Sequence, residues 1–295
     1  LSRGLGDVYK RQAKDMPQFD YYETRKLMSS PAVLLETDRS SAVATITLNR
    51  PRVLNALNHE LSELLQDAVC RVENDSDVRA IVIRGAGGNF MAGGDINAFH
   101  AALQHDESDR KIYFERFIGE VNDTVTRIRR MQKPVVASVA GAVAGFGFSL
   151  MNSCDLVVAA DDSYFTMAYR NIGASPDGSG TYGLPRVVGT KRAMEIALLG
   201  ERIDARRALD LGLINWVVSK EELEMATHSR ATLLARGPTR ALGRTKCLIN
   251  ESLGRSLSEQ LQAEQDSFSA CSGDEDFAIG LEAFLKKKNA EFKGC

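Results

Sequence analysis

Three short apolar segments in the middle of the chain restrict the fold more than any other feature. Residues 80–83 are a continuous apolar run, and residues 134–140 and 156–160 are largely apolar, the pattern of strands that are covered on both faces. The first run ends in a glycine-rich loop. The second leads into a glycine-rich turn and a helical pattern through about Ser153. This repeated order of strand, glycine turn and helix predicts an α/β layered core.

Further elements continue this order along the chain. Residues 43–48 are rich in β-branched side chains and partly alternate, which predicts a strand, and residues 212–218 predict the last strand of the core. Apolar residues at three- and four-residue steps predict helices over residues 57–72 and 112–128. The predicted strands and helices therefore alternate over most of the chain.

The two ends of the chain have a different character. Helical patterns dominate after residue 220, so we predict a core over residues 28–220 and a helical C-terminal region over residues 221–295. Residues 1–12 resemble the translation of a sequencing adaptor, and we exclude them from the fold reasoning. A disordered natural tail is the alternative for that segment.

The composition restricts the classes of partner and compartment. The chain has 295 residues, a formal charge of -2 and 44% hydrophobic residues. This balance is ordinary for a soluble protein and argues against nucleic acid as the main partner. No apolar run approaches the roughly 18 residues needed to span a bilayer. The cysteines are widely spread and the histidines have no metal-binding spacing, so we expect a reducing, cytoplasmic location and no metal site.

Two glycine-rich segments, residues 85–96 and 141–147, carry the strongest functional signal. Glycine lets the main chain come close to a ligand, and two backbone N–H groups aimed at one carbonyl oxygen form an oxyanion hole. The alternative for each segment is a plain strand-to-helix turn. A dinucleotide-binding fingerprint fails because Phe90 occupies the place of its third glycine. The chain also lacks a Gly-x-Ser-x-Gly elbow, which argues against a serine hydrolase.

Several motifs occur in the order typical of the crotonase superfamily, the enoyl-CoA hydratase and isomerase group, which the chain resembles from about residue 40 to its C-terminus. The matching segments are Thr47-Leu48-Asn49-Arg50-Pro51 with Asn55-Ala56-Leu57, Ala92-Gly93-Gly94-Asp95-Ile96, Lys133-Pro134-Val135-Val136-Ala137, Cys154-Asp155-Leu156, Leu184-Pro185-Arg186-Val187-Val188-Gly189, and Gly212-Leu213-Ile214. Each segment is weak evidence alone, whereas their ordered occurrence is specific. The resemblance implies a crotonase-like spiral of ββα units. It also implies acyl-CoA thioester substrates, no separate cofactor, and a helical C-terminal region that forms a homotrimer or a dimer of trimers.

The resemblance also implies roles for individual residues. The backbone N–H groups of Gly94 and Phe146 would form the oxyanion hole, with the Phe146 ring pointing away from it. Lys287 would reach a phosphate of coenzyme A from the C-terminal helix, in the same or a neighbouring subunit. The other coenzyme A contacts implied by the resemblance are Arg52, Leu54, Ala92, Asp95 and Ile96.

The acidic residues depart from the hydratase pattern. Hydratases of this superfamily use two glutamates, and the corresponding positions here are Ser149 and Tyr169. Asp177 supplies a single carboxylate nearby, and one carboxylate is enough to move a proton between two carbons. Adding water needs two groups, one to hold and deprotonate the water and one to protonate the α-carbon, and paired carboxylates can divide these tasks. The alternative for Asp177 is the N-cap of a helix that starts near Ser179, and the two roles are compatible. We expect Asp95 to cap or brace the first glycine loop.

These residues lead to a functional prediction with stated alternatives. Residues 163–188 resemble most the ring-opening epoxide isomerase of phenylacetate catabolism. We therefore predict an acyl-CoA isomerase that shifts a double bond, or isomerises an unsaturated ring acyl-CoA, by proton transfer through Asp177. The alternative is an enoyl-CoA hydratase or acyl-CoA hydrolase in which Asp177 activates water. A nucleic-acid-binding protein is a third possibility, which the net charge disfavours. The acyl group stays open, since Phe99, Phe148 and Tyr182 fit either its pocket or the core.

Overall fold

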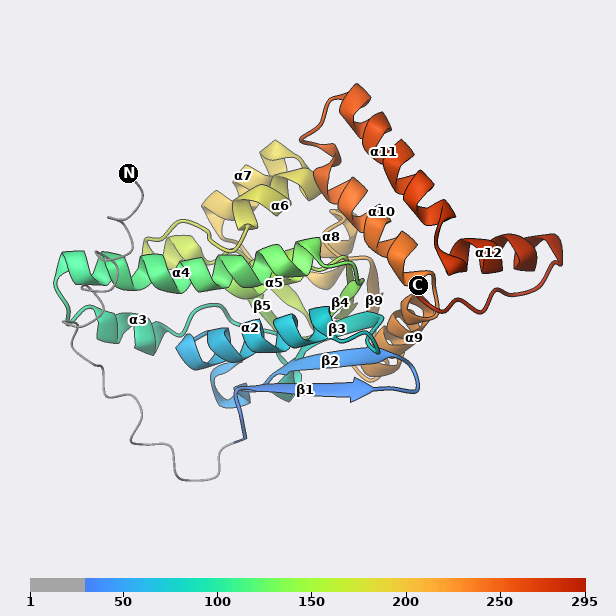
Figure 1. Ribbon diagram of the computed structural model, residues 1–295. Coiled ribbons are helices and arrows are strands. Elements are labelled where there is room, and N and C mark those ends of the chain that lie inside the picture. The colour runs from blue at the N-terminus through green and yellow to red at the C-terminus, as the bar shows by residue number, and fades with distance from the viewer. Residues whose placement is uncertain (1–29) are drawn as a thin grey trace, which may run out of the picture. The chain divides into compact units, whose positions relative to one another are not determined.

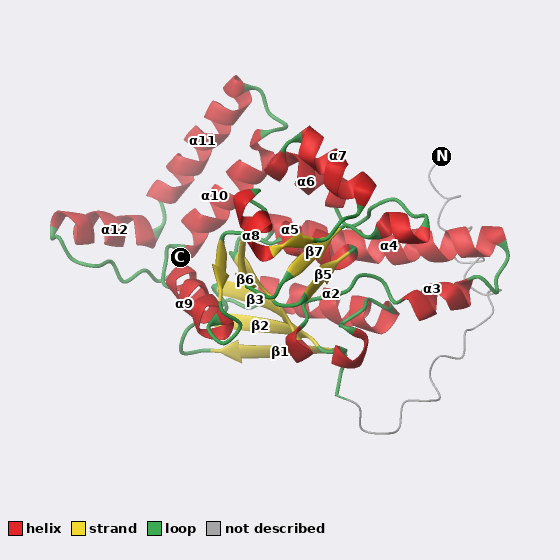
Figure 2. Ribbon diagram, turned by 180° about the vertical axis from the view of Figure 1, so that it is seen from behind, coloured by secondary structure: helices red, strands yellow, loops and turns green. Residues whose placement is uncertain are grey.

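Two β-sheets and the helices packed on them make up the fold (Figures 1 and 2). The computed structural model describes residues 30–295, of which residues 31–295 form one compact unit. The expected tail at residues 1–12 and the predicted start of the core at residue 28 lie outside the described residues. In the described part of the chain, no helix combines the length and the apolarity needed to cross a membrane.

The larger sheet has the strand order β1-β2-β3-β4-β6-β9, and the smaller sheet has the order β5-β7-β8. The edge strand β1 is antiparallel to β2, and the other pairs of the larger sheet are parallel. The strands are β1 Val33–Asp38, β2 Val43–Leu48, β3 Ala80–Gly85, β4 Val135–Val139, β5 Ala142–Ala144, β6 Leu156–Ala160, β7 Tyr164–Thr166, β8 Ile203–Asp204 and β9 Trp216–Val218.

Helices follow or separate the strands in the order that the sequence predicts. They are η1 Pro51–Val53, α2 His59–Asn74, η2 Ala86–Gly88, α3 Ile96–Ala102, α4 Glu107–Arg130, α5 Phe146–Ser153, η3 Tyr169–Ile172, α6 Gly180–Val188, α7 Thr190–Leu199, α8 Ala205–Asp210, α9 Leu223–Ala235, α10 Thr239–Ser252, α11 Leu257–Ser272 and α12 Glu275–Leu285. The α/β layered core predicted from the sequence is therefore confirmed.

The central strands of the larger sheet, β2, β3, β4 and β6, are mostly buried, and their side chains alternate between its two faces. Ile81 and Ile83 of β3 belong to the main core, which also takes in the apolar faces of α2 and α4. Ala80 and Val82 point to the other face and pack with α9. This arrangement explains the unbroken apolar run in the sequence. It also places α9, part of the predicted C-terminal region 221–295, directly on the sheet.

The two sheets are linked by consecutive strand pairs. The pair β4 and β5, and then the pair β6 and β7, each place one strand in each sheet, and α5 follows β5. Since β3 and β4 are parallel neighbours, the loops that follow them leave from the same edge of the larger sheet. In open α/β sheets this carboxyl edge is the usual place for a ligand.

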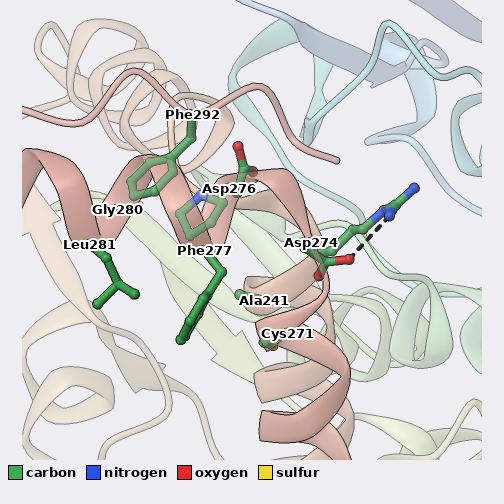
Figure 3. A pocket seen from close by; sticks show the side chains of 10 residues that line it. Ala241, Cys271, Asp274, Asp276, Phe277, Gly280, Leu281 and Phe292 are labelled. Atoms are coloured by element: carbon green, nitrogen blue, oxygen red, sulfur yellow. Dashed lines mark hydrogen bonds and ion pairs between the residues drawn. The ribbon is translucent and has the colours of Figure 1, made fainter.

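The last helices form a separate packing arrangement. No residue of α11 is buried, and α12 buries only Asp276. A hollow of about 260 Å³ lies between α10, α12 and the segment around Phe292. Figure 3 shows the apolar side chains of Phe277, Leu281 and Phe292 around it. All residues that line this hollow lie between 238 and 292, so it is not part of the glycine-rich loops.

Candidate active site

The two glycine-rich loops run side by side and are joined by main-chain hydrogen bonds. Phe90 N donates to Ala140 O at 2.9 Å and Met91 N donates to Ala142 O at 3.0 Å. Ala144 N returns a bond to Met91 O at 2.9 Å. The segment after β3 therefore follows β5 in register, which brings loops that are 50 residues apart in sequence into direct contact.

Glycine is required where the two loops meet. Gly93 has φ +93° and Gly145 has φ +51°, values that L side chains rarely adopt. A Cβ atom on Gly93 would lie 3.2 Å from Ala144 O, and one on Gly145 would lie 3.3 Å from Gly93 Cα. The absence of both side chains lets the main chains of the two loops come into contact. Gly94 directly follows Gly93, and Phe146 directly follows Gly145.

The N–H groups of Gly94 and Phe146 are available to a ligand. Within residues 30–295, neither group donates to a carbonyl oxygen or to a side chain. Phe146 opens α5, whose first N–H groups have no helical partner and carry the positive end of the helix dipole. The Phe146 ring is buried beneath the Asp177 turn, since a Cβ atom on Gly178 would lie 2.6 Å from it.

A buried asparagine holds the first loop in place. Asn55 is fully buried, and its side-chain amide donates to the carbonyl oxygens of Ala86, Asn89 and Phe90 at 3.0, 2.7 and 3.2 Å. Its Oδ1 accepts the Arg50 N–H at 2.9 Å. One side chain thus satisfies buried main-chain groups of the loop that would otherwise lack partners.

Asp95 braces the end of the same loop. Its carboxylate caps α3 by accepting the Asn97 N–H at 3.1 Å, and it forms an ion pair with Arg50 at 2.9 Å. The expectation that Asp95 caps or braces this loop is confirmed. Both carboxylate oxygens of Asp95 therefore have partners, and they fix the segment that follows Gly94.

Asp177 lies beside the second loop, on the turn that covers Phe146. Ser149 Oγ of α5 donates to the Asp177 carbonyl oxygen at 2.9 Å, and Tyr169 Oη donates to Asp177 Oδ1 at 2.6 Å. The N-cap of α6 is Ser179, which has φ +70° and no side-chain capping bond. The alternative that Asp177 caps this helix is therefore wrong, since Gly178 and Ser179, both with positive φ, separate it from α6 and its carboxylate binds Tyr169 instead.

Burial raises the pKa of Asp177, and the hydrogen bond from Tyr169 opposes this rise. Burial also raises the pKa of Tyr169, and the neighbouring Asp177 charge adds to that effect. Tyr169 is therefore a protonated donor at neutral pH. A half-buried carboxylate with a raised pKa can both take and return a proton, since general acid–base catalysis works best when the pKa approaches the working pH.

The residues predicted to contact coenzyme A divide into two groups. Arg52 and Leu54 are exposed in and after η1, and Ala92 N donates to Leu54 O at 3.0 Å, so this segment borders the first loop. Ile96 is exposed at the start of α3, beside Asp95. These four residues and Asp95 therefore lie together. Lys287, which follows α12, has no hydrogen bond or ion pair to any of them.

The three aromatic residues left open by the sequence have different surroundings. Phe99 lies against the first glycine-rich loop, because a Cβ atom on Gly94 would lie 2.3 Å from its ring. Phe148 is fully buried and belongs to the core. Tyr182 is exposed, and the guanidinium of Arg186 lies 3.5 Å from its ring centroid.

The chain matches known proteins over almost its whole described length. The sequence model of the family described as enoyl-CoA hydratase/isomerase matches residues 38–295. The chain belongs to this family. It is 38% identical over 252 residues to the 1,2-epoxyphenylacetyl-CoA isomerase of Escherichia coli. The matched segment covers 85% of this chain and 95% of that protein. This similarity supports the predicted resemblance to the phenylacetate-pathway isomerase.

Hydratases of the family are also similar to the chain. The crotonyl-CoA hydratase of Syntrophomonas wolfei is 34% identical over 268 residues, which covers 90% of this chain and 99% of that protein. The crystal structure of an enoyl-CoA hydratase from a Polaromonas species superposes with a TM-score of 0.83 at 34% identity, covering 88% and 99% of the two chains. The crotonase-like fold and membership of this enzyme family are therefore established, whereas family membership alone does not select between hydration and isomerisation.

Sequence reasoning missed the structural use of two residues in this site. The sequence shows Asn55 as part of a motif, but its clamp on three carbonyl groups depends on a left-handed backbone at φ +57°. The sequence identifies Tyr169 only as a position without a carboxylate. Its hydrogen bond to Asp177 is found only in the folded structure. Among residues 30–295, no group of three or more His, Cys, Asp or Glu side chains is placed to hold a metal ion.

Proposed function

We propose that the protein is an acyl-CoA isomerase in which Gly94 and Phe146 bind the thioester oxygen and Asp177 carries the proton. The observation that carries this proposal is that the Asp177 turn packs on Phe146, and that Ser149 and Tyr169, where the resemblance implies the paired glutamates of a hydratase, both bind Asp177. The similarity to a 1,2-epoxyphenylacetyl-CoA isomerase supports it. The substrate would be a 3-enoyl-CoA or an unsaturated ring acyl-CoA.

The proposed reaction needs no group beyond these three. The Asp177 carboxylate removes a proton from the α-carbon of a 3-enoyl-CoA, and the electron pair delocalises into a dienolate. The thioester oxygen then carries negative charge, which the N–H groups of Gly94 and Phe146 stabilise together with the N-terminus of α5. The protonated Asp177 returns the same proton to the γ-carbon, which leaves the double bond one position closer to the thioester.

The water-adding alternative makes a different demand on the site. Hydration needs one group to hold and deprotonate water and another to protonate the α-carbon. Ser149 is fully buried and donates to a main-chain carbonyl, and Tyr169 donates to Asp177, so neither is placed as a second acid. A hydratase or hydrolase in which Asp177 alone activates water is the alternative outcome of the test.

The test is product analysis in deuterated water, with Asp177→Asn as the variant. Proton NMR of the product from 3-hexenoyl-CoA should show the 2-enoyl isomer and no hydroxyl product. Asp177→Asn should retain the fold and ligand binding while turnover falls by about 10²–10⁴, the usual worth of a general base. A hydroxyacyl product would instead favour the hydratase, and unchanged turnover in the variant would reject Asp177 as the proton carrier.

The assembly, the coenzyme A contacts and the location complete the proposal. We propose a homotrimer or a dimer of trimers formed through residues 221–295. Large apolar side chains of α11 and α12 support it, since Phe268 and Phe284 are 68% and 81% exposed in the single chain. We also propose that coenzyme A lies along η1 and the first loop, that Lys287 reaches it from a neighbouring subunit, and that the enzyme is cytoplasmic. Sedimentation analysis of the full chain would test the trimer, and a monomer would contradict it.

A further inference from the structure

We propose that Tyr169 is a positioning residue for proton transfer: its hydroxyl holds one carboxylate oxygen of Asp177 and leaves the other oxygen to exchange the proton. This inference rests on the proposed function, in which Asp177 is the proton carrier. It adds a residue that does not itself touch the reacting carbons.

The geometry fixes Asp177 at two points. Its carbonyl oxygen accepts hydrogen bonds from Ser149 Oγ at 2.9 Å and from Gly180 N at 3.0 Å, which holds the main chain. Its Oδ1 accepts the Tyr169 hydroxyl at 2.6 Å, which holds the side chain. The second oxygen, Oδ2, receives no hydrogen bond from any other described residue. The two carboxylate oxygens are therefore not equivalent.

This restraint matters because a carboxylate rotates easily. The terminal torsion of aspartate is broad, so an unheld carboxylate would exchange its two oxygens and its direction. Tyr169 is only 9% exposed, and its bond to Oδ1 is in the range of a charge-assisted O–H···O⁻ hydrogen bond. The tyrosine therefore restrains Oδ1 and favours one orientation for Oδ2.

Among the side chains around Asp177, Tyr169 has the largest effect on its pKa. Burial is the largest effect on the pKa of Asp177 and raises it, and the Tyr169 hydrogen bond is the largest opposing effect. The neighbouring hydroxyls of Ser149 on α5 and Ser179 before α6 are uncharged, and no charged side chain of residues 30–295 contributes. Removal of the tyrosine hydroxyl should therefore raise the pKa of Asp177.

The experiment compares pH profiles of Tyr169→Phe and the native enzyme with 3-hexenoyl-CoA. Asp177 must be ionised to take a proton, so kcat/KM falls on the acid side as its pKa is crossed. The variant should move this acid limb upward by about 1–2 pH units, the equivalent of one hydrogen bond to a charged group. In addition, kcat on the plateau should fall while KM changes little. Tyr164→Phe, which removes a hydroxyl on β7, is the matched control and should leave the limb in place.

A direct titration keeps the inference testable if activity becomes too low. Carbon-13 NMR of aspartate-labelled enzyme, with the Asp177 signal assigned from Asp177→Asn, should show the same upward shift in Tyr169→Phe. Coincident titrations or coincident acid limbs would overturn the role of Tyr169. If Asp177→Asn is inactive and Tyr169→Phe shows no shift, only this inference fails. If Asp177→Asn is fully active, the proposed function fails first.

Discussion

Substitution of Gly93 by alanine tests whether the two glycine-rich loops form one oxyanion site. The added Cβ atom would lie 3.2 Å from Ala144 O and 3.4 Å from Gly145 Cα, both on the opposite loop and both main-chain atoms. Neither can rotate away, so the loops must separate by a few tenths of an ångström. That displacement falls directly before Gly94 and Phe146, the two proposed donors.

The expected loss of rate in Gly93→Ala follows from the narrow range of distances over which oxyanion donors act. Oxyanion donors act at about 2.7–3.1 Å, and loss of one donor typically costs about 10²–10³ in rate. We therefore expect kcat/KM of Gly93→Ala to fall by about 10². A non-glycine residue with positive φ also costs about 1–2 kcal/mol of folding stability. This second effect must be separated from the first.

Gly212→Ala provides the matched control. Gly212 also has positive φ, at +76°, but a Cβ atom there would meet no other atom within 4 Å. Both variants should lose the stability cost of positive φ in urea denaturation, and Gly93→Ala should lose more because of its close contacts, whereas only Gly93→Ala should lose activity well below its unfolding transition. Equal activities in the two folded variants would refute the idea that contact between the loops sets the oxyanion hole.

Two further predictions concern two buried polar residues, Lys246 and Asn55. Lys246 is buried and pairs with Asp155 at 2.8 Å, so Lys246→Met should cost about 3–5 kcal/mol of stability in urea denaturation by leaving a buried charge unpaired. Burial raises the pKa of Asp155, so the stability cost of Lys246→Met should shrink as the pH falls and Asp155 becomes protonated. The control is Lys111→Met at an exposed position, which should keep nearly the native stability. Asn55→Ala should lower stability by at least about 2 kcal/mol and reduce kcat, because buried carbonyls lose their donor. The exposed Asn74→Ala is its control, and equal losses would contradict this role.

The fold could be predicted from the sequence because its signals are local. Residues 156–160 form β6 with the predicted bounds, and the run at 134–140 contains β4, because a strand covered on both faces is apolar at nearly every position. Ser138, the polar exception in β4, is buried and accepts a hydrogen bond from Thr227 Oγ1 at 3.0 Å. The short strands β5, β7 and β8 were not predicted. They have two or three residues each, and pairing in the second sheet rather than composition defines them. The predicted boundary near residue 220 coincides with the end of the strands, although α9 still packs on the sheet.

The site was less predictable because it depends on where distant segments meet. Motif order drew attention to Gly94, Phe146 and Asp177, but nothing local to these residues shows that the loops pair through Met91 or that Ser179 replaces Asp177 as the cap. A left-handed residue that is not glycine, such as Ser179, has only a weak sequence signal. Asp and Ser have similar N-cap propensities, so residue type alone could not exclude Asp177 as the alternative cap, and the turn geometry decides for Ser179.

The same turn geometry bears on which reaction the family scaffold supports here. Because Ser179 starts α6, the Asp177 side chain is free of the helix end and reaches Tyr169 in η3. Ser149 meanwhile binds the Asp177 main chain from α5. The two positions at which the resemblance implies the glutamates of hydratases thus both bind one aspartate. A site in which both of these side chains hold a single acid suits the return of a proton to a second carbon. In that reaction the direction of the carboxylate matters more than the capacity to bind water.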